Sequence, residues 1–123
     1  MLAGGTGITP IFQILQAAHK NKDTCHFSVI FGNKTSQDIL MKNELDEIKE
    51  AKNFNLNFNY LIDKNEDGWE GLVGYVNKDM ITKHLPGPGD NTIILICGPP
   101  IMCERSKSLL IELGYSKDFI FEF

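Results

Sequence analysis

The chain has 123 residues, which is enough for one compact domain and too few for two of ordinary size. Hydrophobic residues make up 42% and charged residues 23% of the chain, a balance typical of a folded globular protein rather than a disordered one. The net charge of -4 argues against a nucleic-acid partner, and no apolar run reaches the roughly 20 residues that a membrane span needs.

Short apolar runs alternate along the chain with stretches of helical periodicity. The strands predicted from these runs are 1–3, 25–32, 54–62, 92–97 and 118–123. The predicted helices follow Thr9, follow Ser36 to about residue 51, and span 77–85 and 100–113. The run at 92–97 is continuously apolar, which is typical of a central parallel strand buried on both faces. The alternating order predicts an α/β fold with three α-β-α layers around a five-stranded parallel sheet.

Helix boundaries have local signals. Thr9 fits an N-cap, and Pro10 fits the first helical position, where its missing N–H costs nothing. Ser36 is the predicted N-cap of the second helix. Gly114 is a predicted C′ glycine after the last helix.

Ligands of parallel sheets bind beyond the carboxyl ends of the strands, so the residues that follow each strand are candidates for a site. After the first strand come Gly4, Gly5, Thr6 and Gly7. Glycines allow positive φ and let a phosphate approach the backbone closely, beside the positive end of the next helix. The loop lacks the Lys-Ser/Thr pair of a Walker loop, and Pro10 stands at the third glycine position of G-x-G-x-x-G. A tight turn without a ligand is the alternative.

Two other strand ends carry reactive groups. Asp63 could accept hydrogen bonds from an adenosine ribose and repel a 2′-phosphate, which favours NADH over NADPH, or it could simply form a turn. Cys97 opens the segment "CGPP", where a ligand's reactive end could touch its thiol, although a buried cysteine is more often a small hydrophobe. Tyr75 and Met102 could flank a planar base or belong to the core.

Cys25, Cys97 and Cys103 show no metal-ligand spacing, so no metal site is predicted. Their odd number indicates reduced thiols in a reducing compartment.

Several motifs together resemble one family. "GGTGITP", "CGPP", an aspartate after the third strand and an aromatic final residue look like the pyridine-nucleotide domain of the ferredoxin reductase superfamily, and most of all like NADH–cytochrome b5 reductases. The segments 33–40, 61–64, 74–81 and 97–102 are similar as well. The resemblance spans residues 1–123.

The resemblance implies a domain that binds NADH and orients it for hydride transfer to FAD, with electrons passing on to a haem protein such as cytochrome b5. It assigns the cysteine by the nicotinamide to catalysis and the other matching positions to the cofactor. The implied residues are Gly4, Gly5, Thr6, Gly7 and Thr9 at the pyrophosphate; Asp63 at the ribose; Cys97, Gly98 and Pro99 at the nicotinamide; Tyr75 and Met102 beside the nucleotide; and Phe123 on the flavin side.

The family holds its flavin in an antiparallel barrel with its own motif, which these residues lack. We therefore expect an FAD-binding domain of the same polypeptide upstream of residue 1, an intracellular location on the cytosolic face, and any membrane anchor outside this segment. Three alternatives stay open: the FAD/NADH part of a nitrate reductase, a non-catalytic adenine-nucleotide-binding module, and a protein-interaction domain that uses the fold as a scaffold.

Overall fold

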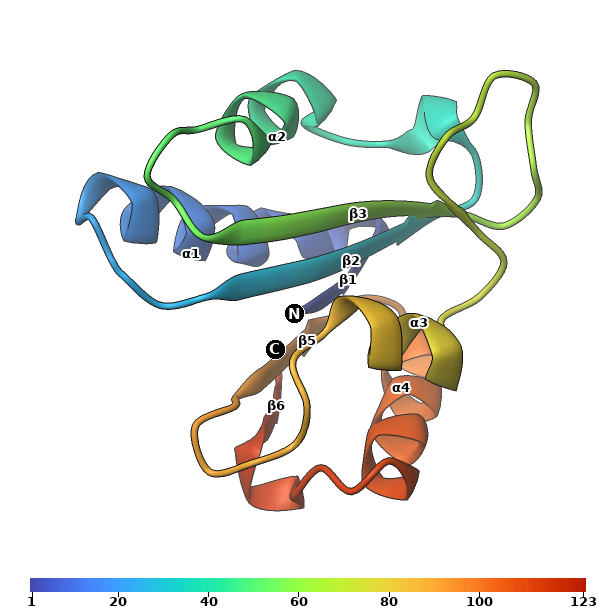
Figure 1. Cartoon of the computed structure of the whole chain (residues 1–123). Coiled ribbons are helices and arrows are strands. Elements are labelled where there is room, and N and C mark those ends of the chain that lie inside the picture. The colour runs from blue at the N-terminus through green and yellow to red at the C-terminus, as the bar shows by residue number, and fades with distance from the viewer.

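Six parallel strands form one sheet in the computed structural model, which describes residues 1–123. Their order across the sheet is β4-β3-β2-β1-β5-β6, and every neighbouring pair is parallel, which confirms the predicted fold class. Figure 1 shows the strands fanning from β3 to β6 with β1 in the middle. The strands are β1 Leu2–Gly4, β2 Phe27–Asn33, β3 Leu56–Ile62, β4 Leu72–Val73, β5 Ile94–Cys97 and β6 Ile120–Glu122.

Four helices cover the sheet in two layers, α1 and α2 on one face and α3 and α4 on the other (Figure 1). Three short 3-10 turns connect elements at Gly5–Gly7, Ser36–Asp38 and Lys117–Phe119. The helices are α1 Ile8–Lys20, α2 Lys42–Lys49, α3 Lys78–His84 and α4 Pro100–Glu112. None of them is long and apolar enough to cross a membrane.

The period of two along the strands divides the buried side chains between two cores. Ala3 and Phe31 belong to the core under α1 and α2, whereas their chain neighbours Leu2 and Ile30 belong to the core under α3 and α4. All four side chains are fully buried. The central strands β1 and β2 are therefore apolar on both faces.

The sixth strand, β4, was not predicted from the sequence. Its two residues pair with Leu61 and Ile62 at the end of β3. A two-residue strand is too short to show the alternation on which strand prediction depends, and it follows a polar turn.

The predicted start of the first helix is wrong by two residues. The 3-10 turn Gly5–Gly7 runs directly into α1, whose N-cap is Gly7. Thr9 therefore lies inside the first turn as an exposed residue and caps nothing. Pro10 is also in the first turn, where N–H groups have no intrahelical partner, so a proline is still tolerated there.

The predicted second helix is also wrong in its first third. Ser36 begins a 3-10 turn, in which the Asp38 carboxylate accepts hydrogen bonds from Thr35 N and Oγ1 at 3.2 and 2.9 Å. Met41 then adopts a left-handed conformation with φ of 58°, so α2 starts only at Lys42. The break leaves Leu40 outside α2, where it is 44% exposed.

The last two helices agree with their sequence signals. Asn77 caps α3 by accepting a hydrogen bond from Met80 N at 2.9 Å. Gly114 follows α4 with φ of 97°, a conformation that favours glycine.

Candidate functional site

A cleft of about 520 Å³ lies beyond the carboxyl ends of β1, β2 and β3. Its walls come from segments that are far apart in the sequence, because the parallel sheet brings the ends of these strands to one edge. Seven of the predicted site residues line it: Gly4, Gly5, Thr6, Asp63, Tyr75, Pro99 and Met102.

One end of the cleft, which we call the glycine end, is formed by residues 4–7 and 97–99. Gly4, Gly5, Thr6 and Pro99 line the cleft there, and Gly7, Cys97 and Gly98 pack beside them without lining it. Gly5 has φ of 53°, which favours glycine. Gly7 packs so closely on the Cys97 carbonyl that an added Cβ would overlap it. A Cβ on Gly4 would meet the Met102 sulfur and, at 3.1 Å, Pro99 Cδ. Gly4 and Gly7 thus have no room for a side chain, so the two segments pack closely at these positions.

The first turn of α1 opens at the glycine end. Its N-cap, Gly7, has no side chain to accept a hydrogen bond from the helix N–H groups, and the first turn contains no acidic residue. Ile8 N–H is bonded to Gly5 O and Thr6 O, so the backbone N–H groups of the preceding 3-10 turn, together with the helix dipole, are the groups that attract an anion. This turn can therefore hold a phosphate group.

The "CGPP" segment joins β5 to α4 beside this turn. Cys97 is the last residue of β5, is half-buried, and pairs with Ala3 of β1. A Cβ on Gly98 would lie 2.9 Å from the Met102 sulfur and 3.2 Å from Gly4 N, so glycine is needed where the two loops meet. Cys97 and Gly98 stand next to the cleft rather than on the wall that surrounds its volume.

Cys103 is the other thiol nearby, and its environment is structural. Its Sγ donates a hydrogen bond to Gly98 O at 3.4 Å, and burial raises the pKa of the Cys103 thiol. The group stays protonated and packs in the core under α3 and α4.

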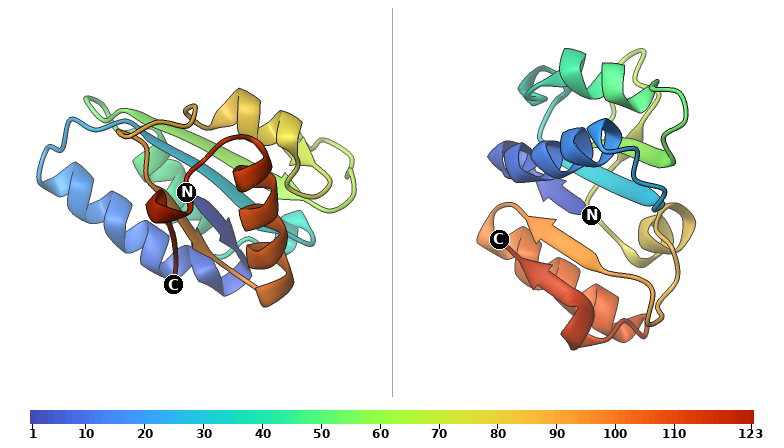
Figure 2. Two further views of the ribbon diagram at one scale, coloured as in Figure 1. Left: turned by 90° about the horizontal axis from the view of Figure 1, so that it is seen from below. Right: turned by 90° about the vertical axis from the view of Figure 1, so that its left-hand side faces the viewer.

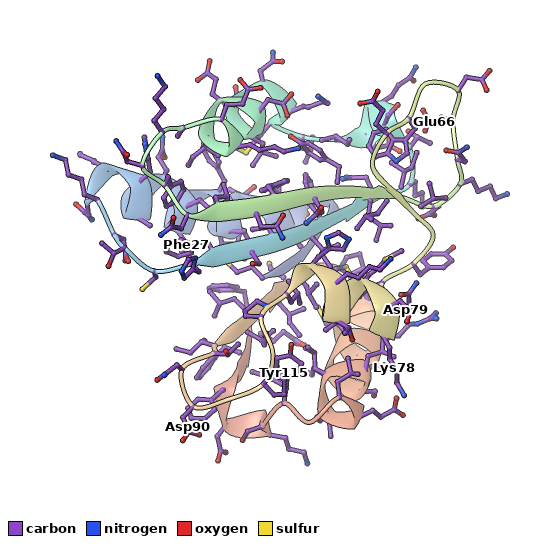
Figure 3. All side chains as sticks on the ribbon, in the orientation of Figure 1. Phe27, Glu66, Lys78, Asp79, Asp90 and Tyr115 are labelled. Carbon is purple, nitrogen blue, oxygen red and sulfur yellow. The ribbon has the colours of Figure 1, made fainter.

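The other end of the cleft, which we call the acidic end, consists of Asp63 and residues 33–40. The loops that follow β2 and β3 are joined there by hydrogen bonds. Asp63 N donates to Lys34 O at 3.2 Å. Ser36 N and Oγ donate to the two oxygens of the Glu66 carboxylate at 2.9 and 2.6 Å. Figure 3 shows Glu66 in the loop that approaches the turn after β2.

These hydrogen bonds have an electrostatic consequence. The bonds from the Ser36 hydroxyl and backbone N–H hold the pKa of Glu66 below its ordinary value of 4.5. The ionised Glu66 fixes the loop that carries Asp63, although Glu66 itself does not line the cleft.

Tyr75 contributes an aromatic ring to the lining of the cleft. It follows Gly74, whose φ is 109°, and its side chain is 63% exposed. The guanidinium of Arg105 lies 5.8 Å from the centre of the ring. An exposed aromatic face at a cleft can stack a planar group. Arg105 was not singled out from the sequence.

Two predicted residues lie away from the cleft. Thr9 is the second residue of α1 and exposed. Phe123 N donates to Ile96 O at 3.0 Å, which holds Phe123 beside the end of β5 with its ring 61% exposed. Neither residue belongs to the cleft wall.

Sequence reasoning missed several residues of the acidic end. Asn33, Lys34, Asp38 and Leu40 all line the cleft, and all follow or end β2. The position of Asn33 at the end of a strand was a usable signal, because the same rule selected Asp63. Asp38 and Leu40 could not be predicted to line the cleft, because the expected unbroken helix would have given their side chains other directions.

A second cavity, of about 610 Å³, lies along the outer side of β3 and contains none of the predicted residues. Three of its polar side chains are already paired with one another: Tyr60 OH donates to Asp46 Oδ1 at 2.7 Å, and Asp46 also binds Lys42 at 2.6 Å. It is away from the carboxyl ends of the central strands, so the smaller cleft is the better candidate.

The chain is similar to known proteins in both sequence and fold. The sequence model of the oxidoreductase NAD-binding domain matches residues 1–108. NADH-cytochrome b5 reductase 2 of Rattus norvegicus is 42% identical over 127 aligned residues, which include the whole of this chain and 45% of the relative. The chain thus spans less than half the length of that relative.

Solved structures agree with the fold. The cytochrome b5 reductase domain of Ulva prolifera nitrate reductase superimposes with a TM-score of 0.93 at 31% identity, over 100% of this chain and 47% of that one. The CS-b5R domains of human Ncb5or, solved in an NAD+ form, give a TM-score of 0.84 at 28% identity, over 99% of this chain and 35% of that one.

Proposed function

The chain belongs to the oxidoreductase NAD-binding domain family, and from this premise we propose that it binds NADH in the strand-end cleft and orients it for hydride transfer to a flavin. The observation that best supports this proposal is the composition of the cleft. The cleft joins a glycine-rich candidate anion site at the glycine end to a carboxylate at the acidic end, and an exposed aromatic ring also lines it.

The cofactor fits these residues by their chemistry. A pyrophosphate needs N–H donors and close approach, which the Gly4–Gly7 loop and the first turn of α1 offer. A ribose diol needs an acceptor, which Asp63 offers. Asp63 also disfavours a 2′-phosphate by charge repulsion, so we propose NADH rather than NADPH.

Bound NADH supplies the hydride, and the protein's part is to bind, orient and shield it. Cys97, at the end of β5, is the residue proposed to lie against the nicotinamide, together with Gly98 and Pro99 that follow it. No acid or base is required of the protein for this transfer.

The flavin is proposed to come from an FAD-binding domain, with cytochrome b5 as the haem acceptor. The similarity to NADH-cytochrome b5 reductases supports this proposal. So does the edge of the sheet at β6, which α1 and α2 leave uncovered on their own face of the sheet (right-hand view of Figure 2). By strand alternation Ile93, Phe121 and Phe123 share that face, and they are 59%, 51% and 61% exposed.

A second candidate is the corresponding part of a nitrate reductase, which the close superposition on the Ulva prolifera domain favours. Both candidates require the same NADH site and differ only in the acceptor. Steady-state assays of the longer protein with cytochrome b5 and with nitrate as acceptor separate them.

Calorimetric titration of the 123-residue chain with NADH, NADPH and ADP-ribose tests the nucleotide site directly. We expect NADH and ADP-ribose to bind and NADPH to bind more weakly. A chain that is folded by circular dichroism but binds none of the three would refute the proposed function.

A further inference from the structure

The side-chain amide of Asn33 is the one buried side-chain polar group that lacks a hydrogen-bond partner. Asn33 is 8% exposed, and its Nδ2 has no acceptor within the protein. Buried donors are nearly always paired, because an unpaired one loses its bonds to water without replacement. An unpaired buried amide at the edge of a cleft therefore points to an acceptor that comes from outside the chain.

The position of Asn33 shows which part of a ligand it faces. It is the last residue of β2 and continues the row of Val29 and Phe31, which point to the face covered by α1 and α2. The residue before it, Gly32, pairs with Gly4 on one side, and Asn33 itself pairs with Ile62 on the other. Asn33 thus belongs to the part of the acidic end that is nearest the glycine end, and it lines the cleft.

We propose that Asn33 is a binding residue of this site, whose Nδ2 donates a hydrogen bond to a phosphate or ribose oxygen of the adenosine half of the dinucleotide. The proposal rests on the proposed function and deepens it. The acceptor belongs to the adenosine half because Asn33 stands between the loop assigned to the pyrophosphate and the aspartate assigned to the ribose.

A leucine at this position separates binding from folding. Asn33→Leu removes the buried unpaired donor, so the unliganded protein should unfold at the same temperature or higher. The same change removes the donor to the ligand, so ADP-ribose should bind about tenfold more weakly, which is ~1.4 kcal/mol. A purely structural role predicts the opposite pattern, with lower stability and unchanged affinity.

The experiment is calorimetry of the 123-residue chain with ADP-ribose and with AMP, together with thermal unfolding. Asn33→Asp keeps the size of the side chain, replaces the donor by a carboxylate and gives a second variant if leucine disturbs packing. Asn59→Leu is the matched control, because Asn59 is on the neighbouring strand and binds Asn57 Oδ1 outside the cleft. We expect both Asn33 variants to lose affinity for ADP-ribose and AMP alike, and the control to keep it.

The outcomes are distinct. Equal affinity of the wild type and both Asn33 variants for ADP-ribose overturns the assignment of Asn33 and leaves the nucleotide site intact. A loss for ADP-ribose with no loss for AMP overturns its placement on the adenosine half. If the wild-type chain binds neither ligand, the proposed function fails and the role of Asn33 falls with it.

Discussion

The two ends of the cleft are built from different parts of the chain. At the glycine end, backbone segments pack directly on one another because their residues lack a Cβ. A single Cβ at Gly7 would overlap the Cys97 carbonyl. The acidic end is made of side chains on two loops, which are joined by hydrogen bonds of Ser36 with Glu66 and of Asp63 with Lys34. A substitution should therefore be severe and structural at the first end, and milder and more selective at the second.

The largest effect is expected at Gly7. Gly7→Ala forces a Cβ against backbone that cannot move alone, so we expect a loss of about 3 kcal/mol or more in the free energy of unfolding. Urea unfolding measures it. Gly87→Ala is the control, because a Cβ added there would have no atom within 4 Å, and it should change stability by less than about 0.5 kcal/mol. Similar values for the two variants would show that the glycine end is not tightly packed.

A selective effect is expected at Asp63. Asp63→Ala removes the charge that repels a 2′-phosphate, so the preference for NADH over NADPH should narrow about tenfold, or ~1.4 kcal/mol, with little change in stability. Calorimetry with both nucleotides gives the ratio. Asp67→Ala, an exposed aspartate of the same loop outside the cleft, should leave it unaltered. A ratio that does not move in Asp63→Ala removes the ribose assignment.

Replacing Cys97 tests whether a side chain at the glycine end contributes to hydride transfer. Cys97→Ser keeps the backbone and should leave the affinity for NADH unchanged. Hydride transfer to flavin in the longer protein should slow about fivefold, which is well below the roughly 100-fold that a 1 Å misplacement of the substrate can cause. Stopped-flow absorbance of the flavin measures the rate. Cys25→Ser, at an exposed thiol, is the control. Unchanged transfer with bound flavin would leave Cys97 without a catalytic role.

The smallest effect is expected at Glu66, and it depends on pH. The pKa of Glu66 is lowered in the folded protein, so its ionised form adds stability above the ordinary value of 4.5 and loses it as the pH falls below that value. Glu66→Gln should therefore lower the melting temperature near neutral pH by a small amount that disappears in acid. Thermal unfolding between pH 7 and pH 3 follows this difference, with Glu70→Gln as control. A difference independent of pH would assign the effect to packing.

The strands, and those cleft residues that directly follow a strand, could be predicted from the sequence. Runs of apolar residues located the strands, and the same topology rule placed Gly4, Asp63 and Pro99 on one cleft. The sequence was insufficient where tertiary contacts decide local conformation. The left-handed Met41, the two-residue β4 and the early start of α1 have no period or cap that a sequence window can detect.

The same limit explains the missed residues of the acidic end. In the sequence, Asn33 looks like the polar residue that ends an apolar strand. Only the folded structure shows that its side-chain amide is buried and that Nδ2 has no hydrogen-bond partner. Glu66 is 30 residues from Ser36, so their hydrogen bonds leave no trace in the pattern of either segment.

A crystal structure of the 123-residue chain with bound NAD+ tests the central claim most directly. The account predicts the pyrophosphate within hydrogen-bond distance of the backbone N–H groups of the Gly4–Gly7 loop, and the adenosine ribose at Asp63. A dinucleotide seated instead in the cavity beside Tyr60, or bound with its pyrophosphate away from the glycine loop, would contradict it.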